Sequence, residues 1–112
     1  MLVSHNIVTC LDGTLPASLS PAVYSLLREQ LGFAGVAITD DLALDAVEDY
    51  ARGGSAAVMA LQAGADMVLT DRPQENIAQV LSALDCGELS PERLQEAVLR
   101  ILLWKLELGV IE

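Results

Sequence analysis

Two adjacent carboxylates, Asp40 and Asp41, follow a short apolar run and could carry chemistry. The run Val-Ala-Ile-Thr at 36–39 predicts a buried strand, and two like charges at its end are costly to desolvate. In parallel α/β folds, ligands and reacting groups gather at the carboxyl ends of strands. Asp40 is therefore a candidate catalytic carboxylate, whereas Asp41 or Asp45 is expected to cap the turn into the next helix.

Two more polar residues, His5 and Asp71, are placed where they could join such a site. His5 lies in the first predicted strand and is the only histidine, so a histidine cluster for zinc is excluded. It is expected either to form structural hydrogen bonds or to face the carboxyl edge of the sheet. Asp71 ends the third predicted strand much as Asp40 ends the second, but Arg72-Pro73 after it indicates a turn or a helix start.

The stretch Thr-Cys-Leu-Asp-Gly-Thr at 9–14 points to a second kind of chemistry. It resembles the signature of haloacid-dehalogenase-type phosphatases, in which a strand ends in Asp-x-Asp-Gly-Thr. Cys10 stands where that family has its nucleophilic Asp, so a turn formed by Asp12 and Gly13 is the favoured interpretation. The sequence contains no glycine-rich phosphate loop and no dinucleotide-binding fingerprint.

Three predicted strands, near residues 2–8, 35–39 and 66–70, must position these side chains. The stretches GVAITD and GADMVLTD form a weak repeat whose threonines lie about 31 residues apart, the length of one βα unit. Continuous apolar strands that alternate with helices indicate a parallel sheet covered on both faces. The predicted fold class is therefore α/β, built of parallel βα units.

Helices are predicted between and after the strands, at 21–31, 42–51, 55–63, 73–84 and 91–108. Ser20-Pro21 begins the first helix and Gly32 ends it. Its buried face is expected to hold Val23, Leu26, Leu27 and Leu31. The last helix is apolar on almost every side, which is typical of a helix buried all round. Three strands are too few to bury it, so the chain is expected to self-associate or to belong to a larger fold.

Composition limits the classes of partner. The 112 residues are 53% hydrophobic with a net charge of −10, so one folded domain is expected, and nucleic acid or an anionic membrane is excluded as a main partner. No apolar run is long enough to span a bilayer. Cys10 and Cys86 are expected to be buried, reduced thiols. The basic residues are scattered and predict no cluster: Arg28, Arg52, Arg72, Arg93, Arg100 and Lys105.

Residues 20–47, SPAVYSLLREQLGFAGVAITDDLALDAV, resemble the segment around the catalytic nucleophile of family 3 glycoside hydrolases, most closely in the β-N-acetylhexosaminidase branch. The matching residues form a long ordered series: Leu27, Arg28, Leu31, Gly32, Phe33, Gly35, Val36, Thr39, Asp40, Asp41 and Leu42. The stretches 1–8, 56–69 and 89–111 resemble the neighbouring strands and helices of that family. The resemblance therefore covers nearly the whole chain.

The resemblance implies a TIM-type (β/α)8 barrel, of which residues 1–112 would be a single truncated catalytic domain similar to the last three βα units. By motif match, Asp40 is the family's nucleophile and Asp41 serves the turn beside it. The family's acid/base histidine lies in a Lys-His-Phe-Pro-Gly-His-Gly-Asp motif that has no counterpart here. His5 does not match that motif and is kept only as a candidate substrate-binding residue.

The function implied by the resemblance is retaining hydrolysis of terminal β-linked N-acetylglucosamine, through a carboxylate that forms a covalent glycosyl ester. The expected partner is a carbohydrate substrate, without a metal or organic cofactor. Without the acid/base, the chain alone is expected to be inactive. Two other functions stay open: a phosphatase relic around Asp12, and a non-catalytic α/β interaction module.

Overall fold

A computed structural model describes residues 1–43, 47, 49–51 and 54–111 of the chain. Within this part the strands are β1 (Leu2–Val3), β2 (Ile38–Asp41) and β3 (Met67–Leu69). The α-helices are α1 (Pro21–Ser25), α3 (Ala56–Ala63), α4 (Pro73–Cys86) and α5 (Pro91–Leu108). Two 3-10 helices, η1 (Ala17–Leu19) and η3 (Asp49–Ala51), and a π-helix, η2 (Leu26–Gln30), complete the described elements.

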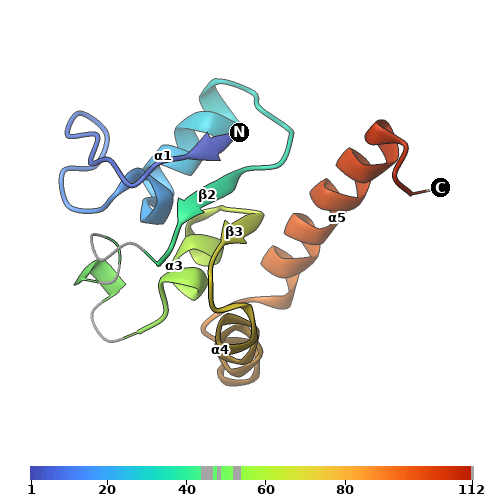
Figure 1. Ribbon diagram of the computed structural model, residues 1–112. Coiled ribbons are helices and arrows are strands. Elements are labelled where there is room, and N and C mark those ends of the chain that lie inside the picture. The colour runs from blue at the N-terminus through green and yellow to red at the C-terminus, as the bar shows by residue number, and fades with distance from the viewer. Residues whose placement is uncertain (44–46, 48, 52–53, 112) are drawn as a thin grey trace.

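The three strands form one parallel sheet in the order β1-β2-β3 (Figure 1). The predicted α/β fold with parallel strands is therefore confirmed, although each strand is shorter than predicted. β1 ends early because the backbone that follows it pairs elsewhere: the carbonyls of Ser4 and Asn6 accept hydrogen bonds from the amides of Ser18 and Ala17. The chain after β1 is thus bonded to η1 instead of to β2.

The first helical segment begins as predicted, with Pro21 in the first turn and the Ser20 hydroxyl accepting from the Val23 amide. It then widens into η2, where the Leu31 amide bonds the Leu26 carbonyl five residues back. The wider turn shifts the helical face, so the prediction that Leu31 is buried is wrong: its side chain is 69% exposed. Leu27 faces the core as predicted, and Tyr24, which was not on the predicted face, is buried beside it.

The predicted helix at 42–51 falls largely on residues 44–46 and 48, which lie outside the described residues, as does the alternative cap Asp45. The later helices follow the prediction closely. α3 begins at a Ser55 cap, α4 begins at Pro73, and α5 is capped by Ser90 and ends at Gly109 in a left-handed conformation. These boundaries are local, because each is set by a cap residue and a proline or glycine next to it.

The main core lies between the sheet and the helices α1 and α3, and Tyr24 is at its centre with 2% exposure. Tyr24 packs so closely on Gly64 that a Cβ added there would lie 2.6 Å from the Tyr24 Cβ. Gly64 also has a φ of +138°, which side chains rarely allow. Glycine is therefore required at this end of α3.

A buried carboxylate, Asp66, lies just before β3, with a side chain that has no exposed surface. Its Oδ2 accepts hydrogen bonds from Arg28 Nη2 and from the Ala37 amide, the latter at 3.1 Å. Its Oδ1 accepts from Arg100 Nη1 at 3.0 Å and from Arg93 Nη2 at 3.4 Å. The prediction of no basic cluster is therefore wrong, because three arginines that are distant in sequence converge on one carboxylate.

The arginines around Asp66 also fix the segments that carry them or pass beside them. Arg28 Nη1 donates to the carbonyls of Phe33 and Gly35, which lead into β2. Arg93 Nε donates to the Leu61 carbonyl of α3 at 2.9 Å. Burial lowers the pKa of Arg28, and the charge of Asp66 opposes that shift. The carboxylate thus compensates cations that are largely withdrawn from water.

Much of α5 has no cover in the described part of the chain. Figure 1 shows the helix running away from α4, so that its carboxyl half lies apart from the sheet and the other helices. Only Ala97 of the helix is buried. The exposed apolar side chains are Val98, Leu99, Leu102, Leu103, Trp104, Leu106 and Leu108. The sequence-based expectation that three strands cannot bury this helix is confirmed.

Both cysteines are free and exposed, so the prediction of buried thiols is wrong. Cys10 lies in the loop before η1, and Cys86 is the last residue of α4. Apolar neighbours in sequence suggested burial, but they do not determine which way a side chain faces in a loop or at a helix end.

Replacing Asp66 by Asn is expected to lower the free energy of unfolding by about 3–5 kcal/mol, because three cations that are largely withdrawn from water lose their counter-charge. Urea unfolding followed by circular dichroism measures the change. The matched control is Asp71→Asn, which removes a carboxylate that is 64% exposed and 3.8 Å from Arg72. That change should cost less than about 1 kcal/mol. Equal losses in the two variants would contradict the role given to Asp66.

The chain alone is expected to self-associate through the apolar face of α5. Light scattering at high protein concentration should give a mass above the 11.9 kDa of one chain. Replacing Leu99 and Leu103 by Lys places two charges on that face and should return the mass toward a monomer. A monodisperse native monomer at high concentration would count against this expectation.

Candidate active site

Asp40 lies near the carboxyl end of β2, where the pairing with β3 is irregular. Ile38 is aligned with Met67 and Asp41 with Leu69, so β2 uses three steps where β3 uses two. The extra residue is a β-bulge, a feature that bends a strand and redirects its side chains. Thr39, buried beside it, accepts a hydrogen bond from the Leu69 amide at 3.2 Å through its hydroxyl.

The carboxylate of Asp40 is half-buried, and one of its oxygens is held by the backbone. Its Oδ1 accepts a hydrogen bond from the Asp41 amide at 2.7 Å. Among the residues that the structure describes, none donates a hydrogen bond to Oδ2. The Asp41 amide thus restrains the orientation of the carboxylate through Oδ1.

Asp41 has the turn role predicted for it. Its Oδ1 accepts from the Ala43 amide at 2.9 Å, which forms an Asx turn after the strand. Its own amide donates to Asp40, and its carbonyl accepts from His5 Nε2 at 2.8 Å. All three polar parts of Asp41 are therefore engaged within the protein.

His5 lies beyond β1 at the same edge of the sheet and bonds through both ring nitrogens. Nε2 must donate to the Asp41 carbonyl, because a carbonyl only accepts. In the neutral ring, Nδ1 then accepts from the hydroxyl of Ser18, at 2.6 Å and with Ser18 fully buried. The expectation of a hydrogen-bonded structural histidine is confirmed. The substrate contact predicted for His5 stays a prediction.

Asp12 closes a turn, as favoured from the sequence. Its Oδ1 accepts from the amide and hydroxyl of Thr14 at 2.9 and 2.7 Å, and from the Leu15 amide. Its Oδ2 accepts from the Ser20 hydroxyl at 2.8 Å. The hydrogen bonds from Thr14 and Ser20 lower the pKa of Asp12 from 3.8 to about 2. Both oxygens of Asp12 thus serve the turn.

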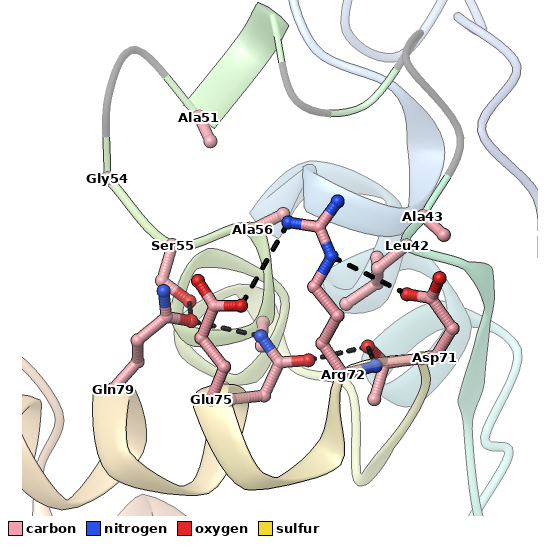
Figure 2. A pocket seen from close by; sticks show the side chains of 13 residues that line it. Leu42, Ala43, Ala51, Gly54, Ser55, Ala56, Asp71, Arg72, Glu75 and Gln79 are labelled. Carbon is pink, nitrogen blue, oxygen red and sulfur yellow. Dashed lines mark hydrogen bonds and ion pairs between the residues drawn. The ribbon is translucent and has the colours of Figure 1, made fainter.

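A polar pocket of about 250 Å³ lies at the carboxyl end of β3, between the first turns of α3 and α4 (Figure 2). Asp71 lines it, together with Leu42 and Ala43, which follow Asp41. Its wall contains linked hydrogen bonds: the Ser55 hydroxyl and the Asn76 amide both donate to Gln79 Oε1, and the Thr70 hydroxyl donates to Asn76 Oδ1. The pocket adjoins the end of β2, but Asp40 and His5 do not line it.

The structure therefore brings His5, Asp40 and Asp41 together at one edge of the sheet. Asp71 lies at the same edge, in the turn after β3, while Asp12 belongs to the loop before η1. Ser18, whose hydroxyl bonds Nδ1 of the His5 ring, was not among the residues predicted from the sequence. It lies in the three-residue 3-10 helix η1, which is too short to leave a periodic signal in the sequence.

Metal-binding clusters and membrane-spanning helices are both absent from the described residues. No group of three or more His, Cys, Asp or Glu residues in this part of the chain is arranged to hold a metal ion. None of the described helices is both long enough and apolar enough to cross a membrane.

Comparison with known proteins gives the family. The sequence profile described as the glycosyl hydrolase family 3 N-terminal domain matches residues 1–103. The chain belongs to glycosyl hydrolase family 3. Among curated family 3 relatives, the β-hexosaminidase LpqI of Mycobacterium tuberculosis is 36% identical over 110 residues, which cover 90% of this chain and 28% of LpqI. A β-N-acetylglucosaminidase/β-glucosidase of Cellulomonas fimi is 35% identical over 86 residues, covering 76% of this chain and 15% of the relative.

Solved family 3 structures agree with this assignment. The structure of a glycosyl hydrolase of this family from Mycobacterium smegmatis matches with a TM-score of 0.78 and 38% identity, covering 88% of this chain and 32% of that protein. The chain thus spans less than a third of these relatives. Its parallel α/β fold is that of the matching part of a family 3 protein.

A pH dependence of stability is expected from Asp12. Its lowered pKa means that its hydrogen bonds stabilise the fold fully above 3.8 and that this contribution is lost as the pH falls toward about 2. Asp12→Asn, which does not titrate, should be less stable than the native chain at neutral pH. Thermal unfolding across this range should show the difference in Tm shrinking only below 3.8. A difference that is the same at all pH values would contradict the expectation.

Proposed function

We propose that this family 3 chain is the nucleophile-bearing part of a retaining β-N-acetylhexosaminidase, with Asp40 as the nucleophile. The observation that carries the proposal is the state of the Asp40 carboxylate: one oxygen is held by the Asp41 amide and the other is unbonded within the described residues. The motif Thr-Asp-Asp-Leu at 39–42 and the names of the family 3 relatives support the substrate class.

The proposed placement in the barrel is the last three βα units. It is supported by three adjacent parallel strands in sequence order, and by a candidate nucleophile at the carboxyl end of the middle one. The uncovered apolar face of α5 fits a position against further barrel units. Residues 1–112 would then be part of one catalytic barrel domain.

In the proposed reaction, the free oxygen of Asp40 attacks the anomeric carbon of a β-linked N-acetylglucosaminide. The bond from that carbon to the leaving oxygen breaks as the glycosyl ester forms, and a general acid protonates the leaving oxygen. Water then attacks the anomeric carbon, gives its proton to the same group acting as a base, and releases Asp40. Asp40 supplies the nucleophile, and residues outside this chain would supply the acid/base.

His5 is proposed to contact substrate only through its ring carbons, since both ring nitrogens are bonded within the protein. A phosphatase function centred on Asp12 has no comparable support. Both of its oxygens are used by the turn, and Cys10 precedes it where a nucleophilic carboxylate would be needed.

The decisive experiment places residues 1–112 in LpqI of M. tuberculosis, in exchange for the aligned segment, and assays hydrolysis of an aryl N-acetylglucosaminide. Asp40→Asn in this chimera should lower kcat by about 10³-fold or more, because an amide cannot form the glycosyl ester. Asp12→Asn is the control and should leave kcat nearly unchanged. In Asp40→Ala, added azide should restore turnover and yield a glycosyl azide, since azide can occupy the place of the lost carboxylate.

The chain without further barrel units is expected to hydrolyse natural N-acetylglucosaminides at a negligible rate. A positioned general acid alone typically contributes about 10²–10⁴-fold for a poor leaving group. Full activity of the Asp40→Asn chimera would remove Asp40 from the mechanism. Phosphatase activity of the chain that is lost in Asp12→Asn would overturn the assignment altogether.

A further inference from the structure

Asp41 links His5 to the Asp40 carboxylate, because both its backbone amide and its backbone carbonyl form hydrogen bonds. The Asp41 amide donates to Asp40 Oδ1 at 2.7 Å, and the Asp41 carbonyl accepts from His5 Nε2 at 2.8 Å. A side chain located 36 residues away in sequence is therefore linked to the candidate nucleophile through a single residue. Substrate recognition plays no part in this connection.

The bond from His5 lies where the β-ladder is interrupted. Leu2 is aligned with Ile38 and Val3 with Thr39, and the same register extended by two residues would set His5 opposite Asp41. The backbone of β1 no longer pairs with β2 at this point, because its carbonyls bond η1 instead. The His5 imidazole thus bonds the Asp41 carbonyl at a point where the β1–β2 ladder has already ended.

On its other side, the end of β2 pairs irregularly with β3. The pairing of β2 with β3 is shifted by a bulge between Ile38 and Asp41, and bulged residues have weakened ladder contacts. On the β3 side, the Leu42 amide still donates to the Leu69 carbonyl at 2.9 Å, so the peptide that follows Asp41 keeps one backbone bond there. On the β1 side, where regular pairing is absent, His5 supplies the bond to the same peptide.

The His5 ring is itself held in place from behind. Ser18 has no exposed surface, and its hydroxyl bonds His5 Nδ1 at 2.6 Å. The Ser18 carbonyl accepts from the hydroxyl of buried Tyr24 at 3.0 Å, and the Ser18 amide donates to the Ser4 carbonyl. The hydroxyl partner at Nδ1 leaves the proton at Nε2, where the Asp41 carbonyl needs a donor.

We infer that His5 is a positioning residue, which fixes the Asp41 peptide and through it the attacking geometry of the Asp40 carboxylate. The inference deepens the proposed function and rests on it for its catalytic consequence. Its mechanical part, the restraint on Asp41, rests only on the bonds described above. A misplacement of reacting groups by about 1 Å can cost on the order of 10²-fold in rate, so a single such restraint can matter for turnover.

The test compares three variants. His5→Gln keeps a nitrogen donor near the position of Nε2, whereas His5→Phe keeps the ring but removes both nitrogens. Gln62→Met is the matched control. Gln62 lies near the carboxyl end of α3, and its Nε2 also donates to a backbone carbonyl, that of Glu88. Two readouts are measured: hydrogen exchange of the Asp41 amide in the chain itself, and the rate at which an activated fluoro-glycoside traps the glycosyl ester in the LpqI chimera.

His5→Phe is expected to speed exchange of the Asp41 amide by roughly 3- to 10-fold, the effect of losing about one hydrogen bond. It should slow trapping by about 10- to 100-fold with little change in the apparent affinity for the glycoside. His5→Gln should restore most of both. Gln62→Met should change neither, even where its loss of Tm equals that of His5→Phe.

The outcomes separate the inference from the function on which it rests. Unchanged Asp41 exchange in His5→Phe overturns the positioning role, whether or not the chimera is active. Equal trapping losses in His5→Phe and His5→Gln also overturn it, since a donor at Nε2 would then be irrelevant. Altered exchange together with full turnover in Asp40→Asn refutes the proposed function and removes the catalytic consequence of the His5 bond.

Discussion

The fold depends on one buried charge, the carboxylate of Asp66. It accepts hydrogen bonds from three arginines and from the Ala37 amide at the start of β2. Removing a carboxylate from water is costly unless opposite charges and donors surround it, and the same is true of the arginines. Burial raises the pKa of the neighbouring Tyr24 and lowers that of Arg28, as expected where ionisable groups are desolvated. This requirement fixes η2 and α5, which carry the arginines, relative to each other and to the sheet.

The Asp66 cluster and the candidate site lie at opposite ends of the same strand. Asp66 bonds the amide that leads into β2, while Asp40 and Asp41 end that strand. In parallel α/β proteins the amino ends of strands commonly serve stability and the carboxyl ends serve chemistry. The charges at one end are paired with Asp66, whereas the other end has an irregular, bulged geometry. β2 is thus held firmly where no reaction is proposed and adjusted locally where one is.

The apolar face of α5 is left uncovered by the described part of the chain. The helix exposes leucines and a tryptophan that a self-sufficient small domain would bury. The chain also spans less than a third of the family 3 relatives described above. Both observations are in keeping with the placement proposed above, in which further barrel units cover this face. The first half of α5 is nevertheless anchored, because Arg93 and Arg100 on this helix form ion pairs with Asp66.

Local sequence determined the order of strands and helices, the caps at Ser20 and Ser90, and the position of Asp40 at a strand end. These signals act over a few residues, which is why the boundaries of α3 and α5 agree with the prediction. Tertiary structure alone decided the arginine cluster, the exposure of Leu31 after the wide turn, and the bond from His5 to Asp41. The partners in the cluster and in the His5 bond lie 27 to 38 residues apart in sequence. No local pattern encodes such pairs, because they form only when packing brings their segments together and buried polar groups must find partners.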